Sequence, residues 1–307
     1  MRDTAVLLID CPDRKGLVAR VAGLLYERGA NILHADQHQD HDLGLFFMRV
    51  EWGLSPADGG SVDESCGEHT QRAAPVDSAG AFDLDGFRTA FAELARELGM
   101  RWQLTASAKR PRVALFCSQY LHCVADLLHR WRAGELDCEI PVVISNHREV
   151  EKLAGFYGIA FEHVPVTAAA KYEAEAHQLA LLAQHGVDLI VLARYMQILS
   201  PVFVARYPAA MINVHHSFLP AFTGARPYHA AHARGVKLIG ATSHYVTEAL
   251  DDGPIIEQDV ARISHRDQVE DLVARGRDLE RVVLARAVRW HLDRRILCYG
   301  NKTVVFD

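Results

Sequence analysis

The sequence is poor in cysteine, has no excess of basic charge and contains no long apolar run. Its 6 cysteines are scattered without a Cys-x-x-Cys pair, so we expect reduced thiols and no zinc-type ligand spacing. The formal net charge of -6 argues against a nucleic-acid or membrane-surface partner, because both favour a basic face. No apolar stretch reaches the roughly 18 residues that span a bilayer, and the N-terminus lacks the layout of a signal peptide. We therefore expect a cytoplasmic protein.

Histidine, by contrast, is abundant. None of the 17 histidines belongs to a His-Glu-x-x-His pattern or a comparable acid-supported set, so no metal site is predicted.

The chain has 307 residues, and 50% of them are apolar. A chain of this length can bury large cores, so two globular domains are expected.

Residues 1–106 predict a small ferredoxin-like domain with the order β-α-β-β-α-β. Apolar periodicity indicates strands at 5–10, 31–40, 43–52 and 100–106 and helices at 17–28 and 82–98. Residues 55–80 are rich in Gly, Ser, Pro and Asp and poor in apolar side chains. Such a composition cannot offset the entropy lost on ordering, so a mobile insert is expected there.

The segment D-R-K-G-L-V-A-R-V-A-G-L-L-Y-E-R-G-A-N-I, which begins at Asp13, resembles the ACT domain. The resemblance implies a regulatory domain that binds an amino-acid effector, with glycine and methionine as the candidates, and a homo-oligomer. In that family the effector pocket is bordered by positions that here are Asp13, Gly16 and Asn31. Lys15 stands where proline is more usual. The alternative is that Asp13 to Gly16 only caps a helix.

Residues 107–111 form a polar, basic linker, and from 112 to 307 apolar strands alternate with helical segments. This pattern predicts βαβ units and a buried, mostly parallel, Rossmann-like sheet, which binds ligands at the carboxyl ends of its strands. The expected strands are 113–117, 141–145, 159–165, 188–193, 211–215 and 237–247, and the expected helices are 120–132, 147–156, 171–185, 228–235 and 266–294. Polar residues at the expected strand ends are Ser118, Ser145–Asn146, Arg194–Tyr195, Asn213 and His215.

Asn213 and His215 share one face of the expected strand M-I-N-V-H, and Asp251 follows in the segment L-D-D-G-P. An amide, an imidazole and a carboxylate are the groups that an attack on a carbonyl carbon needs. The amide holds the oxyanion, the imidazole stabilises it or moves protons, and the carboxylate acts as base or orients the imidazole. Asp252 is interpreted as a turn residue.

The motifs N-V-H-H-S-F-L-P, F-T-G-A-R-P-Y-H and T-S-H-Y-V-T-E-A-L-D-D-G-P resemble the catalytic core of the folate-dependent formyltransferase superfamily. Its catalytic Asn, His and Asp fall on Asn213, His215 and Asp251. No glycine lies between Phe116 and Arg132, where members that formylate an amino-ribonucleotide hold a phosphate. That stretch, with Ser118, His122 and Cys123, resembles the branch that hydrolyses 10-formyltetrahydrofolate to formate and tetrahydrofolate. This activity would supply formate for purine synthesis and balance the one-carbon folate pool.

The same resemblance implies where the folate binds, as a substrate and not as a permanently bound cofactor. An apolar wall with a few polar contacts suits a flat heterocycle. Two alternatives stay open: a formyltransferase acting on an amine acceptor, and a non-catalytic folate or amino-acid sensor. The residues expected to contact the substrate are Met196, Gln197, Ile198, Leu199, Val246, Thr247, Glu248, Ser118 and His122.

Overall fold

The computed structural model describes residues 3–54, 82–107, 110–220 and 227–307. The chain forms two compact units, one of Met1–Lys109 with Phe306–Asp307 and one of Arg110–Val305. The insert expected at 55–80 and residues 108–109 of the expected linker lie outside the described residues. The N-terminal unit has an apolar core of its own, distinct from the core clusters of the second unit.

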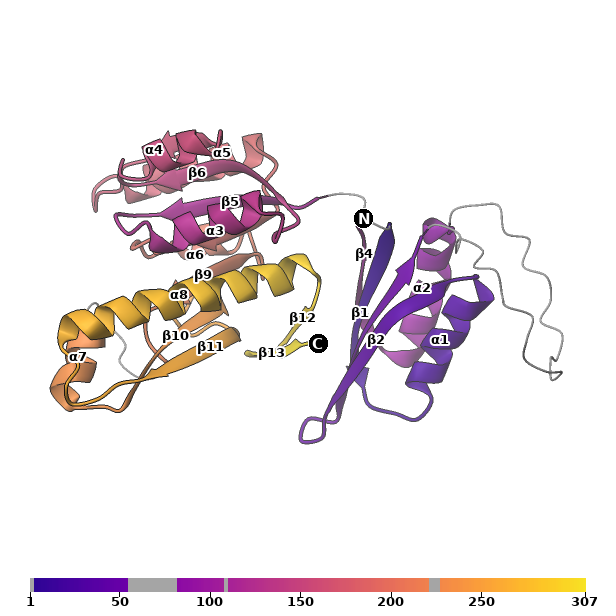
Figure 1. Ribbon diagram of the computed structural model, residues 1–307. Helices are drawn as coiled ribbons and strands as arrows, with labels where there is room; N and C mark the ends of the chain where they lie inside the picture. The colour runs from indigo at the N-terminus through magenta and orange to yellow at the C-terminus, as the bar shows by residue number, and fades with distance from the viewer. Residues whose placement is uncertain (1–2, 55–81, 108–109, 221–226) are drawn as a thin grey trace, which may run out of the picture. The chain divides into compact units, whose positions relative to one another are not determined.

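The N-terminal unit is the expected ferredoxin-like fold. Its four-stranded sheet has the order β2-β3-β1-β4, and β3 and β4 both pair antiparallel with β1. Both helices lie on the same side of this sheet (Figure 1). Their side chains and those of the sheet form a single apolar core. In chain order the elements are β1 (Thr4–Pro12), α1 (Leu17–Glu27), β2 (Asn31–Asp40), β3 (Leu45–Gly53), α2 (Leu84–Leu98) and β4 (Arg101–Ala106).

Local sequence explains the ends of α2 and the face that it buries. The Asp83 side chain accepts a hydrogen bond from the Gly86 backbone N–H at the start of the helix. Gly99 ends the helix with φ 67°, a left-handed conformation that glycine adopts without steric cost. Phe87 and Phe91 are fully buried, one helical turn apart. Aromatic contacts therefore lock α2 onto the sheet.

The second unit is built on a seven-stranded sheet with the order β11-β10-β9-β8-β5-β6-β7. The strands β9, β8, β5, β6 and β7 run parallel, whereas β10 pairs antiparallel with both β9 and β11. The elements are β5 (Arg112–Cys117), α3 (His122–Arg132), β6 (Glu139–Ser145), α4 (Glu151–Phe156), β7 (Ala160–His163), α5 (Lys171–Gln184), β8 (Leu189–Leu192), α6 (Pro201–Val204), β9 (Met211–His215), α7 (Pro227–Arg234), β10 (Leu238–Tyr245), β11 (Ile255–Arg262), α8 (Val269–Leu292), β12 (Ile296–Tyr299) and β13 (Lys302–Val305).

This sheet confirms the prediction of a mostly parallel α/β domain. The side chains of α3 and α8 share a core on one face of the sheet, and those of α5 and α6 share a core on the other. Figure 1 shows α8 crossing the sheet along β9, β10 and β11, which it contacts. None of the described helices combines the length and apolar character needed to cross a membrane. The carboxyl ends of β8 and β9 are adjacent, and the candidate site lies there.

Candidate active site

The structure brings the three expected catalytic side chains together. Asn213 and His215 lie on β9, and Asp251 lies in the loop between β10 and β11. The Nδ1 atom of His215 is 3.1 Å from Oδ2 of Asp251. Asp251 has φ 55°, so the tight turn of L-D-D-G-P directs this carboxylate toward β9 at some conformational cost.

Sequence reasoning assigned no role to a fourth member of this group, His244. It lies opposite Asn213 in the antiparallel pairing of β9 and β10. Its Nε2 atom is 3.2 Å from Nδ2 of Asn213 and 3.6 Å from Oδ1 of Asp251. Its Nδ1 atom donates to the backbone carbonyl of Tyr245 at 2.9 Å. The sequence does contain a clue to His244, because it lies in the expected strand 237–247, shortly before the Asp251 loop.

The electrostatics of this group keep Asp251 ionised. Burial alone would raise the pKa of Asp251, but the hydrogen bonds and positive charge of His215 and His244 outweigh it. The pKa of Asp251 is therefore well below its ordinary value. His215 is only 5% exposed, and its Nε2 atom has no hydrogen-bond partner among the described residues. The carboxylate orients one nitrogen of His215 and leaves the other for a ligand.

Gly253 allows the loop between β10 and β11 to pass close to the backbone of Tyr245. A Cβ atom at Gly253 would lie 1.7 Å from the backbone oxygen of Tyr245, so no other residue fits without movement of the backbone. The Tyr245 backbone N–H donates to the Pro254 carbonyl at 2.9 Å. Asp252, the acid beside Asp251, makes no described side-chain hydrogen bond or ion pair to this group, as a turn residue would.

A cavity of about 630 Å³ is lined by Asn213, His215, His244 and Asp251, the candidate catalytic group. Met196 is 47% exposed and Ile198 is 61% exposed, so the cavity presents apolar surface to a ligand. The residues predicted from the sequence that line the cavity are Asn213, His215, Asp251, Met196, Gln197, Ile198, Leu199, Val246, Thr247 and Glu248. Ser118 and His122 do not line it.

Buried polar residues of α5 hold the loop that carries Met196 and Ile198. The Gln178 side chain donates to the Tyr195 hydroxyl at 2.8 Å, and Glu175 accepts from the Ser200 backbone N–H at 2.9 Å. These hydrogen bonds fix both ends of the loop, at Tyr195 and Ser200. The apolar side chains of Met196 and Ile198 between them line the cavity.

Ser118, expected to contact the substrate, instead supports the same loop from β5. Its hydroxyl donates to Oδ1 of Asn146 at 2.7 Å and accepts from the backbone N–H of Met196 at 3.0 Å. Both hydrogen bonds run between the ends of neighbouring elements. Ser118 therefore acts on the cavity through the position of Met196.

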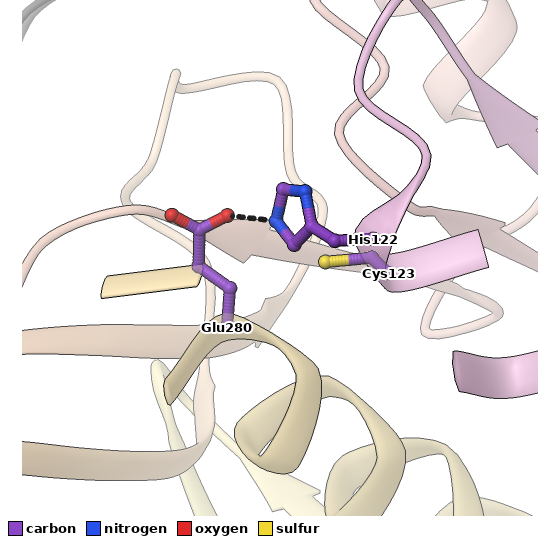
Figure 2. Close-up of side chains that lie close together, drawn as sticks. All are labelled: His122, Cys123 and Glu280. Atoms are coloured by element: carbon purple, nitrogen blue, oxygen red, sulfur yellow. Dashed lines mark hydrogen bonds and ion pairs between the residues drawn. The ribbon is translucent and has the colours of Figure 1, made fainter. Parts of the chain in front are cut away.

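His122, also expected to contact the substrate, pairs with a buried glutamate. Figure 2 shows its ring pointing from α3 to Glu280 of α8, and Nε2 lies 2.7 Å from Oε2. The Tyr228 hydroxyl donates to the other carboxylate oxygen at 2.7 Å, and Nε of Arg194 lies 3.4 Å from Oε2. Burial alone would raise the pKa of Glu280, but these three partners hold it below its ordinary value.

His122, Cys123 and Glu280 are close enough to share one cation. The chemistry of the donors does not fit a resident metal. Both oxygens of Glu280 already accept hydrogen bonds, and the Arg194 guanidinium would repel a cation at the same carboxylate. Burial raises the pKa of Cys123 well above its ordinary value, so the thiol stays protonated. The arrangement is a hydrogen-bonded charge network that joins α3 to α8.

The residues expected to bind an effector lie in the N-terminal unit. Gly16 precedes α1 with φ 89°, and Asn31 is the exposed first residue of β2. The carboxylate of Asp13 accepts from Nε2 of Gln39 at 3.2 Å, and the Asp13 backbone N–H donates to Gly44. Gly16 is the N-cap of α1 and no side chain makes a capping bond there, so the alternative that this segment only caps the helix stays open.

Known proteins resemble both units. Residues 111–288 match the formyl transferase family and residues 5–51 match the ACT domain. A formyltetrahydrofolate deformylase of Synechocystis sp. is 51% identical, with 99% of this chain and 98% of that protein covered. One from Bacillus subtilis is 47% identical over 99% of this chain and 94% of its own length. The crystal structure of a formyltetrahydrofolate deformylase from Pseudomonas syringae pv. tomato has a TM-score of 0.89 and 48% identity, covering 100% of this chain and 95% of that one.

Proposed function

This chain belongs to the family of formyltetrahydrofolate deformylases, and we propose that it hydrolyses 10-formyltetrahydrofolate to formate and tetrahydrofolate. The observation that carries the proposal is the Asn213, His215 and Asp251 group on the wall of one cavity with the apolar Met196 loop. An apolar wall suits the ring of a folate, and the polar group suits attack on its formyl carbon. On this proposal the folate is the substrate and not a resident cofactor.

The mechanism follows from the charge of Asp251. Its carboxylate is ionised and accepts the Nδ1 proton of His215 in a hydrogen bond, which fixes the orientation of the ring. A water oxygen attacks the N10-formyl carbon while His215 and Asp251 take up its proton. Asn213 and protonated His215 then stabilise the oxyanion of the tetrahedral intermediate. Collapse breaks the bond between the formyl carbon and N10, and N10 receives the proton that His215 and Asp251 took from the water. The formic acid formed loses its own proton to solvent, and formate and tetrahydrofolate leave.

Turnover without an amine is the direct test. Purified protein mixed with 10-formyltetrahydrofolate alone should release formate and tetrahydrofolate in equal amounts. Asn213→Ala and His215→Ala should each lower kcat by about a hundred- to a thousandfold, because each removes a stabiliser of the oxyanion. Folate affinity, measured by tryptophan fluorescence titration, should change far less. Asp252→Asn, a change in the neighbouring acid, is the matched control and should keep nearly full kcat.

Three results would contradict the proposed hydrolysis or its assigned residues. If folate binds but no formate appears until an amine is added, the enzyme is a formyltransferase. If neither water nor an amine removes the formyl group, the chain is a folate-binding sensor. A fully active His215→Ala variant would show that hydrolysis is catalysed by other residues.

We further infer that the ACT domain binds an amino acid, glycine or methionine, and that the protein forms a homo-oligomer. Support for an effector comes from the match of residues 5–51 to the ACT domain and from the left-handed Gly16 before α1. Backbone N–H groups at such a turn suit a carboxylate ligand. An oligomer is supported by the exposed edge strand β2, which can pair with a second copy. Light scattering of the purified protein tests that state.

A further inference from the structure

The loop between β10 and β11 holds Asp251 in a backbone conformation that needs support. Asp251 has φ 55°, in the left-handed region that favours glycine. A non-glycine residue keeps such a conformation at a conformational cost, and only where the surrounding structure enforces it. In this conformation Oδ2 of Asp251 lies 3.1 Å from Nδ1 of His215. The groups that fix this loop therefore control the geometry of the candidate catalytic group.

Two hydrogen bonds fix the loop just after Asp251, and both come from the hairpin of β12 and β13. Nδ2 of Asn301 donates to the backbone carbonyl of Asp252 at 2.8 Å. The Thr303 hydroxyl donates to the backbone carbonyl of Ile255, the first residue of β11, at 2.6 Å. The Asn301 bond bears more directly on the catalytic carboxylate, because Asp252 is next to Asp251 in the chain.

The hairpin itself is anchored, so it can hold the loop in place. Tyr299 pairs with Lys302, which leaves Gly300 and Asn301 as a two-residue turn. Gly300 has φ 55°, and glycine suits the first position of such a turn. Ile296, at the base of the hairpin, belongs to an apolar core cluster of the second unit. The Asn301 side chain is therefore presented to the loop by an element that is fixed to the core.

Asn301 also borders the space in which the proposed reaction takes place. It lines the same cavity as Asp251 and His215. The hairpin, residues 296–305, lies beyond residues 111–288, which match the formyl transferase family. Resemblance to that family therefore assigns no role to Asn301. The residue is exposed, so burial does not account for the contact of its amide with the Asp252 carbonyl.

We propose that Asn301 is a positioning residue, which keeps the Asp251 carboxylate directed at His215 by holding the Asp252 carbonyl. The inference deepens the proposed function and rests on it for the reaction that is measured. Without the hydrogen bond from Asn301, the left-handed backbone of Asp251 can relax and its carboxylate moves away from His215. Small displacements of reacting groups are costly, so kcat should be more sensitive to this bond than folate binding is.

The first test compares the kinetics of two variants of the hairpin. Asn301→Ala removes the donor, and Lys302→Gln, the matched control, changes the exposed residue that follows it. We expect Asn301→Ala to lower kcat for 10-formyltetrahydrofolate by about three- to tenfold, the value of one typical hydrogen bond. KM should change little, and Lys302→Gln should keep the native kcat and KM.

The second test does not depend on turnover. Burial raises the pKa of Asp251, but contacts with His215 and His244 lower it by more, so a carboxylate displaced from them should have a higher pKa. NMR titration of the carboxyl group in isotope-labelled protein should show Asp251 taking up its proton at a higher pH in Asn301→Ala than in the native protein. A residue that only stabilised the hairpin would leave this titration unchanged.

The outcomes separate the positioning role from the proposed hydrolysis. In a protein that hydrolyses the folate, an unchanged kcat or an unchanged titration of Asp251 in Asn301→Ala overturns the positioning role. An equal loss of kcat in Lys302→Gln also overturns it, since the turn as a whole and not the Asn301 amide would then matter. If Asn301→Ala shifts the titration but the native protein releases no formate, Asn301 positions Asp251 and the proposed hydrolysis fails.

Discussion

At the scale of single residues, we propose that His244 positions the candidate catalytic group and does not itself react. It contacts both Asn213 and Asp251, is 2% exposed and lines the same cavity, and we expect it to orient these two side chains. We expect His244→Ala to lower kcat by about ten- to a hundredfold, because small displacements of reacting groups are costly. KM for the folate should change little. Steady-state kinetics across a pH series measures both quantities.

A purely structural role for His244 would give a different result. His244 contributes to the low pKa of Asp251, so its loss should raise that pKa and shift the acid limb of the kcat profile to higher pH. His244→Gln keeps a polar group near Asn213 and should recover part of kcat. A variant that loses stability but keeps the native pH profile would contradict the positioning role.

The sequence could predict the positions of those candidate-site residues that belong to local patterns. Asn213 and His215 share one strand, and Asp251 precedes a Gly-Pro break, so each has a signal within a few residues. His244 lies in an expected strand and Arg194 follows another, but no local pattern assigned either a role, because their partners lie on other elements. Ser118 and His122 were expected at the substrate, yet their hydrogen bonds are to Met196, Asn146 and Glu280. Residue type alone does not show whether a side chain contacts the substrate or only positions another residue that does.

At the scale of elements, a buried tyrosine of β10 and a buried histidine of α8 form a hydrogen-bonded pair. This histidine makes the free energy of unfolding depend on pH. The Tyr245 hydroxyl and Nδ1 of His291 form a hydrogen bond of 2.7 Å. Burial, with the charge of Arg294, lowers the pKa of His291 to about 4. The ordinary histidine pKa is about 6.5, so between these values the unfolded chain binds more protons. Stability is therefore complete above about pH 6.5 and falls as the pH drops toward 4.

The expected loss is at most about 3 kcal/mol across this window. It is measured as the free energy of unfolding in denaturant titrations at a series of pH values. His291→Gln should remove most of the difference between pH 6.5 and pH 4. His129→Gln changes an exposed histidine of α3 and should leave the pH dependence as it is. Identical slopes in His291→Gln and the native protein would rule out His291 as the titrating group.

Elements were predictable where apolar periodicity is strong. The β8 segment L-I-V-L is fully buried and was expected as a strand. The β11 segment I-I-E-Q-D-V-A-R has an irregular polar pattern at the sheet edge and was not expected. Its pairing with β10 depends on the turn at Asp251 and Gly253, which no period in the sequence reveals. The antiparallel direction of β10 likewise follows from tertiary structure.

At the scale of the whole molecule, the order of the two folds was readable because each has its own periodicity and turn residues. Separate cores imply that changes in one unit need not unfold the other. Any influence of an effector on hydrolysis must then be a coupling between two sites in one chain. The sequence and the folds give the sites for such a coupling. Only kinetics gives its sign and size.

The effector hypothesis predicts that glycine or methionine changes kcat/KM for 10-formyltetrahydrofolate. Couplings between sites typically amount to about 5- to 150-fold, so an effect of fivefold or more is expected. Asp13→Ala should abolish the response and keep the rate measured without effector, because Asp13 lies in the N-terminal unit. Glu93→Gln, an exposed acid of α2 in the same unit, is the control. Because coupling is reciprocal, a non-hydrolysable folate should change effector affinity by the same factor as the effector changes folate affinity. If neither amino acid binds, or if either binds without changing kcat/KM or folate affinity, the N-terminal unit does not regulate this reaction through them.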